Sequence, residues 1–266
     1  MRGLVDPQGV EPIVFVSSDH INDSCWRIPV QLEERVVHIW GFSLEGASST
    51  IALCRLWMSV EEQARAGRFV RPEDGTGYIL ARGCLRAVLA RYTGLDPSAL
   101  TFQPGATGKP ELAAMPDGGN RIRFNLSHSY GRMLIAVARR QEVGVDLERI
   151  REQVEAARLA RRFYSPTECA SVTGLSGPAQ AARFFRYWAA KEAFLKCKGV
   201  GLQFPLDRCE ITLSADGPTA AVSWKVASGS IEQGWVRFLP LEDGWIGAVT
   251  AGADEWRMDI RRWPLG

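Results

Sequence analysis

The chain lacks the features that mark secreted, membrane-spanning and disulfide-built proteins. Among its 266 residues, no apolar run approaches the ~20 residues that a membrane-spanning helix needs. The apolar run at residues 13–16 is too short for a signal peptide and follows acidic residues. The six Cys are scattered without a C-x-x-C pair, which favours reduced thiols over a disulfide or zinc framework. We therefore expect a cytoplasmic protein that has no contact with a membrane.

An excess of charge of one sign is also absent. The chain has 32 Lys and Arg against 30 Asp and Glu, a net charge of +2, and no long basic run. The many Arg and the nine Trp raise the alternative of a nucleic-acid-binding protein. So small a net charge gives little attraction to a phosphate backbone, and nucleic acid is therefore not an expected partner.

Lysine and histidine are scarce, so their positions are informative. Only five of the 32 basic residues are Lys, and three of these five fall within residues 191–198. Lys is a compact point charge whose pKa shifts readily, unlike that of Arg. This crowding in an Arg-rich chain indicates that Lys is needed there. The five Lys are Lys109, Lys191, Lys196, Lys198 and Lys225, and the three His are His20, His38 and His128.

Residues 186–196 are typical of a helix, because they are good helix formers without Pro or Gly. Trp188, Glu192 and Lys196 are four residues apart and fall on one stripe of that helix. A carboxylate and an ammonium therefore lie one turn apart at the edge of an apolar face. By itself, this spacing is equally typical of a surface ion pair worth a few tenths of a kcal/mol.

A second pair of charged residues stands on a predicted strand at residues 143–147. The strand period of two places Asp146 and Glu148 on one face, with Val145 and Leu147 on the other. Two neighbouring carboxylates repel each other, and a divalent cation such as Mg²⁺ would remove that conflict. Glu192 could supply a third oxygen ligand, and a phosphate-bearing substrate would complete the site. The alternative is the solvated face of an edge strand.

Several residues could bind the anionic part of such a substrate. Ser127 and His128 end a predicted strand at residues 121–126, and Lys109 stands on a turn too short for a P-loop. Arg82 and Arg86 are four apart on a predicted helix at residues 78–92 that Gly94 closes. Taken singly, these residues could equally form a polar turn and a solvated helix stripe.

The order of predicted elements repeats along the chain. A strand, helices and further strands occur from residue 36 and again from residue 143, with the seam near Arg140. Arg-Phe pairs at 68–69 and 162–163, and Gly94 and Gly201, are weak sequence matches between the halves. We predict an α+β fold with two similar lobes, residues 36–140 and 141–266, related by a pseudo-two-fold duplication. A ligand cleft is expected between the lobes, and residues 1–35 are an amino-terminal extension.

Five segments carry these candidate residues in order. They are Gly-Lys-Pro at 108–110, Phe-Asn-Leu-Ser-His-Ser at 124–129, Val-Gly-Val-Asp-Leu-Glu at 143–148, Arg-Phe-Tyr-Ser-Pro-Thr-Glu at 162–168, and Trp-Ala-Ala-Lys-Glu-Ala-Phe-Leu-Lys at 188–196 followed by Gly-Val-Gly-Leu. In this order and spacing, they resemble the 4′-phosphopantetheinyl transferases of the larger, two-lobed, surfactin-synthetase-activating type. The resemblance covers roughly residues 36–249.

The resemblance implies an enzyme that moves the 4′-phosphopantetheine arm of coenzyme A (CoA) to a Ser hydroxyl of an acyl or peptidyl carrier protein. The other product is adenosine 3′,5′-bisphosphate. By similarity, Mg²⁺ would be held by Asp146, Glu148 and Glu192, Glu192 would be the base, and Lys196 would stabilise the departing phosphate. CoA would be bound by Arg65, Arg86, Lys109, Ser127, His128 and Lys196.

One departure from the family concerns the loop at residues 73–77, which has no basic residue to help hold the CoA 3′-phosphate. The alternative function is a CoA- or nucleotide-binding regulatory module without catalysis. The complete set of Asp146, Glu192 and Lys196 argues against it, because binding alone needs neither metal nor base. Two fused lobes can form the whole cleft in one chain, so we expect a monomer. Carriers of fatty-acid, polyketide and peptide synthesis all remain open as partners.

Overall fold

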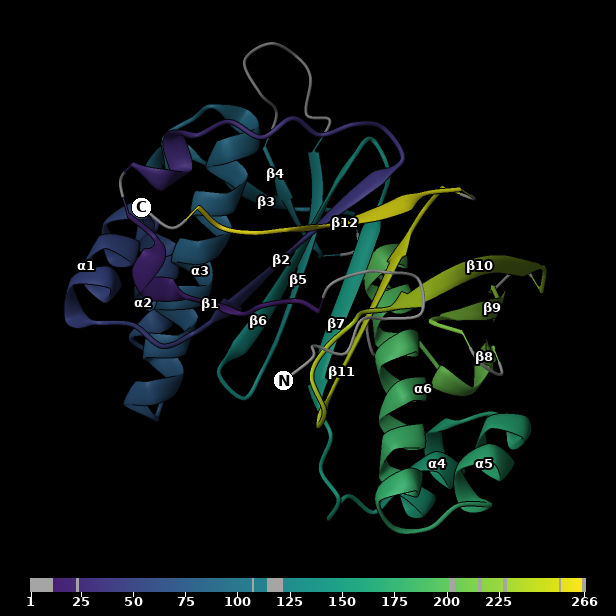
Figure 1. The fold of residues 1–266 in the computed structure, drawn as a ribbon. Coiled ribbons are helices and arrows are strands. Elements are labelled where there is room, and N and C mark those ends of the chain that lie inside the picture. Colours follow the sequence, from purple (N-terminus) through teal and green to yellow (C-terminus); the bar gives the residue numbers. More distant parts are fainter. Residues whose placement is uncertain are drawn as a thin grey trace. The chain divides into compact units, whose positions relative to one another are not determined.

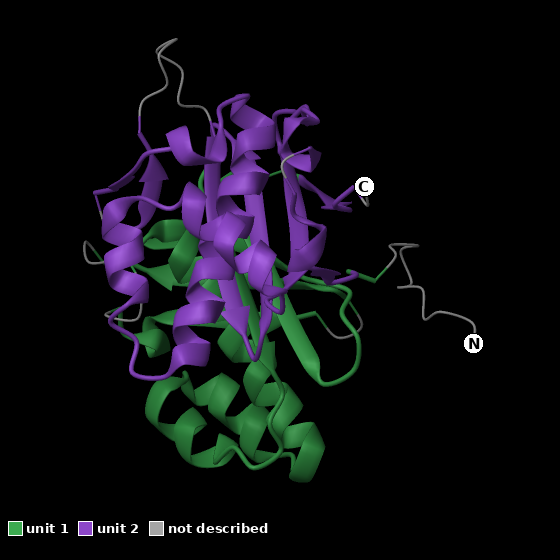
Figure 2. Ribbon diagram, turned by 90° about the vertical axis from the view of Figure 1, so that its left-hand side faces the viewer, with its two compact units in different colours: residues 1–13, 141–256 green, residues 14–140, 257–266 purple. Residues whose placement is uncertain are grey.

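The computed structural model describes residues 12–264 except 23, 107, 114–121, 201–203, 215–216, 227–228 and 254. The chain divides into two compact units, coloured separately in Figure 2. Unit 1 comprises Met1–Ile13 and Gln141–Trp256, and unit 2 comprises Val14–Arg140 and Arg257–Gly266. Both units contain helices and a sheet, so the predicted α+β class is confirmed.

In its described residues, unit 1 has a five-stranded sheet and the α-helices α4, α5 and α6 (Figure 1). Its sheet order is β7-β11-β10-β9-β8, and all neighbouring strands are antiparallel. The long helix α6 packs on β7 and β11. The elements are β7 (Val143–Arg149), α4 (Ala156–Phe163), α5 (Pro166–Thr173), α6 (Gly177–Lys198), the 3₁₀ turn η5 (Leu206–Arg208), β8 (Cys209–Leu213), β9 (Thr219–Lys225), β10 (Ile231–Phe238) and β11 (Trp245–Ala251).

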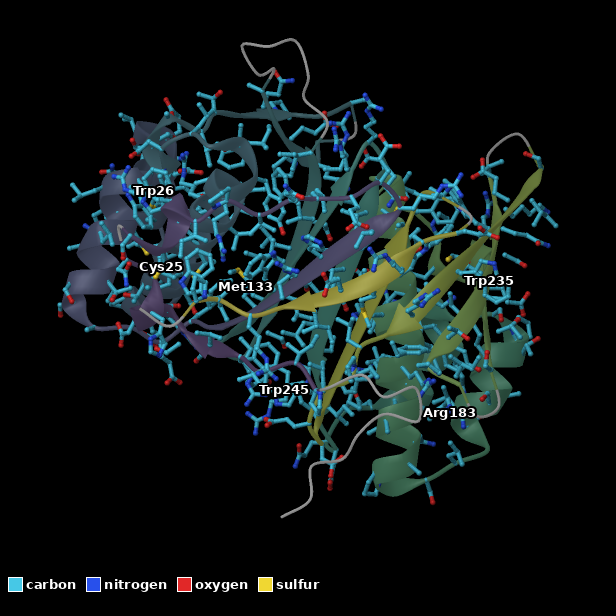
Figure 3. All side chains as sticks on the ribbon, turned by 45° about the horizontal axis from the view of Figure 1, so that its top comes forward. Cys25, Trp26, Met133, Arg183, Trp235 and Trp245 are labelled. Carbon is cyan, nitrogen blue, oxygen red and sulfur yellow. The ribbon has the colours of Figure 1, made fainter. Side chains whose placement is uncertain are left out.

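Unit 2 has a sheet of order β1-β2-β6-β5, with β12 also paired to β2. Cys25, Trp26 and Met133, labelled in Figure 3, belong to its buried core. The elements are β1 (Val16–Ser17), η1 (Ser18–His20), η2 (Cys25–Arg27), β2 (Val36–Ser43), α1 (Ser48–Trp57), α2 (Val60–Ala66), α3 (Pro72–Thr93), η3 (Pro97–Ala99), β3 (Phe102–Pro104), β4 (Pro110–Leu112), β5 (Ile122–Ser129), β6 (Arg132–Arg139) and β12 (Arg257–Arg261).

The units differ from the expected lobes at both chain ends. Residues from Val14 onward were expected to lie outside the lobes, yet β1 pairs with β2 in parallel. Residues 257–261 were expected in the second lobe, yet β12 also pairs with β2 in parallel. An unpaired strand edge exposes backbone donors and acceptors, and here two segments distant in sequence satisfy the same edge of β2. The boundary between the two units falls between Arg140 and Gln141.

Both units repeat one helical arrangement. A short helix that begins with a capping box, Ser59 with Glu62 in α2 and Ser165 with Glu168 in α5, precedes a helix of 22 residues. Both long helices, α3 and α6, have Pro in the first turn and end at a left-handed Gly (φ 70° and 74°). The expected match of residues 68–69 with 162–163 is wrong, because Pro72 begins the long helix and Pro166 begins the short one.

Close packing of α6 on β7 requires a glycine in the strand. A Cβ atom on Gly144 would lie 2.0 Å from the Ala193 carbonyl oxygen and 2.4 Å from the Cys197 backbone nitrogen. Gly144 therefore allows the strand that carries Asp146 to approach the helix that carries Glu192.

Among the described helices, none combines the length and apolarity that crossing a membrane would require.

Candidate active site

Strand β7 and helix α6 bring the acidic and basic candidates of unit 1 together. Asp146 lies in the middle of β7 with a side chain that is 4% exposed. Its Oδ1 atom lies 2.6 Å from Nζ of Lys196, which is in the last turn of α6. The predicted proximity of the strand and the helix stripe is therefore observed as a direct ion pair between two candidate residues.

Glu192 is a second buried acid of this cluster, with 9% of its surface exposed. Burial raises its pKa to about 7; the ammonium of Lys196 opposes this, and the carboxylates of Asp146 and Glu148 add to it. Its Oε1 atom is buried without a hydrogen-bond partner in the described part of the chain. Such an oxygen is costly to leave unsatisfied, so the site is built for a proton or a cation.

Glu148 completes the acidic group. Burial raises its pKa, and the neighbouring carboxylate of Asp146 raises it further, while Arg151 and Lys196 oppose the shift. The side chain of Trp188 also makes a hydrogen bond to Glu148, and because indole can only donate, the carboxylate is the acceptor. Trp188 is stacked on Phe184 with ring centroids 6.0 Å apart. The sequence placed Trp188 on the stripe of Glu192 and Lys196 but did not indicate this contact.

The donor set fits a hard divalent cation. Asp146, Glu148 and Glu192 supply only oxygen ligands, their charges repel one another, and the buried Oε1 of Glu192 lacks a donor among the described residues. As they stand, the described side chains include no group of three acidic, His or Cys residues arranged to hold an ion. The ammonium of Lys196 supplies the positive charge at Asp146 instead. Metal binding would thus replace one cation by another at that carboxylate.

The candidates for binding phosphate lie in unit 2. Ser127 is buried and His128 is exposed near the end of β5, while Lys109 directly precedes β4 and is half-buried. Arg65 is exposed in the last turn of α2, with its guanidinium over the ring of Tyr78 at 5.4 Å. These residues therefore belong to a different unit from the carboxylates and Lys196.

Arg86 does not have the predicted role. Its side chain is 2% exposed and is bonded within unit 2, to the carboxylate of Glu62 and to the carbonyl oxygens of Pro97 and Leu100. Arg82, four residues earlier, binds the same carboxylate. The helix spacing correctly placed Arg82 and Arg86 on one face, but this face is turned inward, where the guanidinium of Arg86 cannot meet CoA.

Two family models match the chain. A model of the 4′-phosphopantetheinyl transferase superfamily matches residues 142–243, and a model of the amino-terminal region of 4′-phosphopantetheinyl transferases matches residues 47–141. These segments correspond closely to the repeated helix-and-sheet parts of unit 1 and unit 2.

Curated relatives match over most of their length. The 4′-phosphopantetheinyl transferase HetI of Nostoc sp. is 32% identical over 225 residues, which cover 83% of this chain and 90% of HetI. The 4′-phosphopantetheinyl transferase Sfp of Bacillus subtilis is 33% identical over 204 residues, which cover 77% of this chain and 86% of Sfp. The similarity thus extends across both units.

Proposed function

The chain belongs to the 4′-phosphopantetheinyl transferase superfamily, and we propose that Asp146, Glu192 and Lys196 carry its transfer reaction. As a member of this superfamily it is an enzyme that transfers phosphopantetheine from CoA to a carrier protein. The observation that carries the residue assignment is the cluster of three buried or half-buried carboxylates with one ammonium on β7 and α6. A purely binding protein would have no use for such a cluster.

The carboxylates are proposed as the Mg²⁺ ligands. Asp146, Glu148 and Glu192 would hold the ion, with Glu148 acting directly or through water. When bound, Mg²⁺ supplies charge neutralisation for the phosphoryl group being transferred and for the leaving group. Burial raises the pKa values of Glu148 and Glu192, and the neighbouring carboxylates raise them further; this supports the assignment, since a cation would relieve the repulsion.

Glu192 is proposed as the base. Its carboxylate would accept the proton of the carrier Ser hydroxyl, directly or through a water molecule. The Ser oxygen then bonds to the phosphorus that carries the pantetheine arm, and the bond from that phosphorus to the bridging pyrophosphate oxygen breaks. The leaving group is adenosine 3′,5′-bisphosphate, so one phosphodiester forms as one phosphoanhydride is cleaved.

Lys196 is proposed to stabilise the phosphate that departs, which requires its ammonium to leave Asp146. The exposed Arg65 and His128, together with Lys109 and Ser127, are proposed to bind the CoA phosphates from unit 2. The expected departure from the family persists, because residues 73–77 form the first turns of α3 without a basic side chain. The CoA 3′-phosphate must therefore be held by residues elsewhere.

We also propose that the protein works as a cytoplasmic monomer. All six Cys are free thiols, five of them buried, which suits a reducing compartment. The decisive experiment measures the intact mass of an apo carrier domain after incubation with the protein, CoA and Mg²⁺. We expect the carrier to gain one phosphopantetheine, with EDTA preventing the gain and added Mg²⁺ restoring it.

Asp146→Asn is the matched variant, because it removes the charge and keeps the shape. It should reduce the rate of transfer by at least about 100-fold, as for the loss of a group that stabilises transition-state charge. Near-normal turnover of this variant would overturn the metal assignment. CoA binding without any transfer to fatty-acid, polyketide or peptide carriers would instead favour the regulatory module.

A further inference from the structure

A second ion pair involves the residue next to Glu192 in the sequence. Lys191 precedes Glu192 in α6, and its Nζ atom lies 2.8 Å from Oε2 of Glu168 in α5. The two side chains are 1% and 0% exposed. The ammonium also donates to the carbonyl oxygens of Leu206 and Cys209. All three of its donors are therefore used inside the protein, and Lys191 has none to offer to a substrate.

The carboxylate of Glu168 is equally occupied. Its Oε2 atom accepts from the backbone nitrogen of Ser165 at 2.9 Å, and its Oε1 atom accepts from that of Ile211 at 2.7 Å. The pair thereby joins the start of α5, the middle of α6 and strand β8. Removing either partner would leave the other charge buried and uncompensated, which proteins tolerate poorly.

The pair also attaches one side of α6 to α5 and β8. Successive residues of a helix point about 100° apart, so anchoring Lys191 toward α5 and β8 directs Glu192 to a different side. Lys196, four residues after Glu192, shares that side and meets Asp146 on β7. A roll of α6 about its axis would move Glu192 and Lys196 together, relative to Asp146.

Unit 2 contains an equivalent ion pair between its capping-box helix and its long helix, but without the neighbouring acidic residue. Glu62 is the third residue of its capping-box helix, like Glu168, and it binds Arg86. Arg86 and Lys191 each stand 14 residues after the first residue of their 22-residue helix. The next residue is Ala87 in α3, where α6 has an acid. The pair is thus common to both repeated units. In unit 1 the next helix residue is the proposed base Glu192, whereas in unit 2 it is Ala87.

We propose that Glu168 and Lys191 are positioning residues that set the roll of α6 and hold Glu192 and Lys196 at the reaction centre. This inference rests on the proposed function of that cluster. Lys191 itself touches neither CoA nor carrier, although it stands beside the base in the sequence. A buried ion pair is a weak source of stability compared with well-packed apolar side chains, whereas its fixed geometry suits a positioning role.

The test uses three variants. Glu168→Gln removes the carboxylate charge of the pair in unit 1, Glu62→Gln is its matched control in unit 2, and Lys191→Met removes the ammonium. For each, kcat, KM for CoA, KM for carrier, the half-saturating Mg²⁺ concentration and the melting temperature are measured. Both Gln variants should lower the melting temperature. Glu168→Gln and Lys191→Met should also lower kcat about 10- to 100-fold and raise the half-saturating Mg²⁺ concentration, with KM for CoA within about threefold. Glu62→Gln should leave kcat within about twofold of the wild type.

Each outcome decides the inference. A kcat for Glu168→Gln as near to normal as that of Glu62→Gln would reduce the pair to a stabilising contact. A raised KM for CoA with unchanged kcat in Lys191→Met would show that Lys191 meets the substrate. If Lys191→Met does not fold, Glu168→Gln decides, because it keeps the two carbonyl contacts of Lys191.

Absence of transfer by the wild type would instead refute the proposed function. Direct Mn²⁺ binding, measured by electron paramagnetic resonance, would then test the pair, and unchanged affinity in Glu168→Gln would overturn it.

Discussion

Nζ of Lys196 lies 2.6 Å from Oδ1 of Asp146, so a proposed phosphate ligand and a proposed metal ligand neutralise each other. Lys196 retains 25% exposure of its side chain, whereas Asp146 retains 4%. The flexible, partly exposed ammonium is therefore the partner that can leave. When Mg²⁺ and CoA enter, this ion pair must be exchanged for contacts of Asp146 to metal and of Lys196 to phosphate.

Lys196→Met should strengthen metal binding in the absence of CoA while it weakens catalysis. Removing the competing cation should increase the affinity for Mn²⁺ about tenfold, on the scale of a charge-assisted hydrogen bond. Turnover should fall about 100-fold, because the leaving phosphate loses its counter-charge. Electron paramagnetic resonance of Mn²⁺ and single-turnover kinetics measure the two effects.

Lys198→Met is the control for this experiment. Lys198 ends the same helix but pairs with the half-exposed Glu232 at 2.8 Å. Its loss should change neither metal affinity nor turnover by more than about twofold, as is usual for surface ion pairs. Equal metal affinity in Lys196→Met and the wild type would mean that the Lys196–Asp146 pair does not compete with the ion.

Trp188→Phe should weaken the metal site without unfolding the protein. Phe keeps an aromatic ring against Phe184 but cannot donate the hydrogen bond to Glu148. A hydrogen bond to a charged group contributes about 1.5–3 kcal/mol, so the half-saturating Mg²⁺ concentration should rise roughly tenfold. Titration of transfer activity with Mg²⁺ measures this, and an unchanged midpoint would show that the contact does not orient Glu148.

His38 should make the stability of unit 2 depend on pH. Trp40 Nε1 donates to the Tyr92 hydroxyl at 2.8 Å, and the same hydroxyl is hydrogen-bonded to Nδ1 of His38, 2.9 Å away. Burial lowers the pKa of His38 from 6.5 to about 4; Arg261 and Arg257 lower it further, while Asp259 and Glu33 oppose the shift. The folded state thus holds the imidazole neutral.

Because the unfolded chain takes up this proton first, the stabilisation is complete above pH 6.5 and is lost as the pH falls toward 4. Compared with His38→Asn, the wild type should lose on the order of 1–3 kcal/mol of unfolding free energy across this range. Urea unfolding at a series of pH values checks this. A difference between the two proteins that is constant with pH would contradict it.

Trp263→Ala should destabilise unit 2, because this residue fastens the segment after β12 to the core. Its ring lies 5.9 Å from that of Trp40 and 5.6 Å from that of Phe42, and Nε1 donates to the His20 carbonyl oxygen at 3.0 Å. Truncating a buried Trp removes about 3–5 kcal/mol of unfolding free energy. Trp235→Ala, at a residue 54% exposed, is the control and should change it by less than about 0.5 kcal/mol. Urea unfolding measures both variants, and comparable losses of unfolding free energy in Trp263→Ala and Trp235→Ala would contradict the role of Trp263.

The sequence predicted those features that depend on neighbours along the chain. The predicted helix end at Gly94 is confirmed, since it results from a local backbone hydrogen bond. Helix α3 begins at Pro72, six residues before the predicted start, because Pro lacks the backbone N–H that the first turn of a helix leaves unbonded and is therefore compatible with that turn. The strand period also correctly placed Asp146 on the opposite face of β7 from the buried Val145 and Leu147, the face that packs against α6 at Gly144.

The spacing of residues along the chain cannot show which of several similar charged side chains is buried, or which groups bind it. The tertiary structure decided both. Lys191 and Lys196 looked alike in the sequence, yet one ammonium is saturated by Glu168 and two carbonyl groups and the other meets Asp146. Arg86 was placed on the correct helix face, but the packing of η3 and Glu62 turns that face inward. The pairing of β12 with β2 joins residues more than 200 positions apart. Local patterns determine helices, strands and their faces, whereas the partner of each buried charge depends on contacts between distant segments.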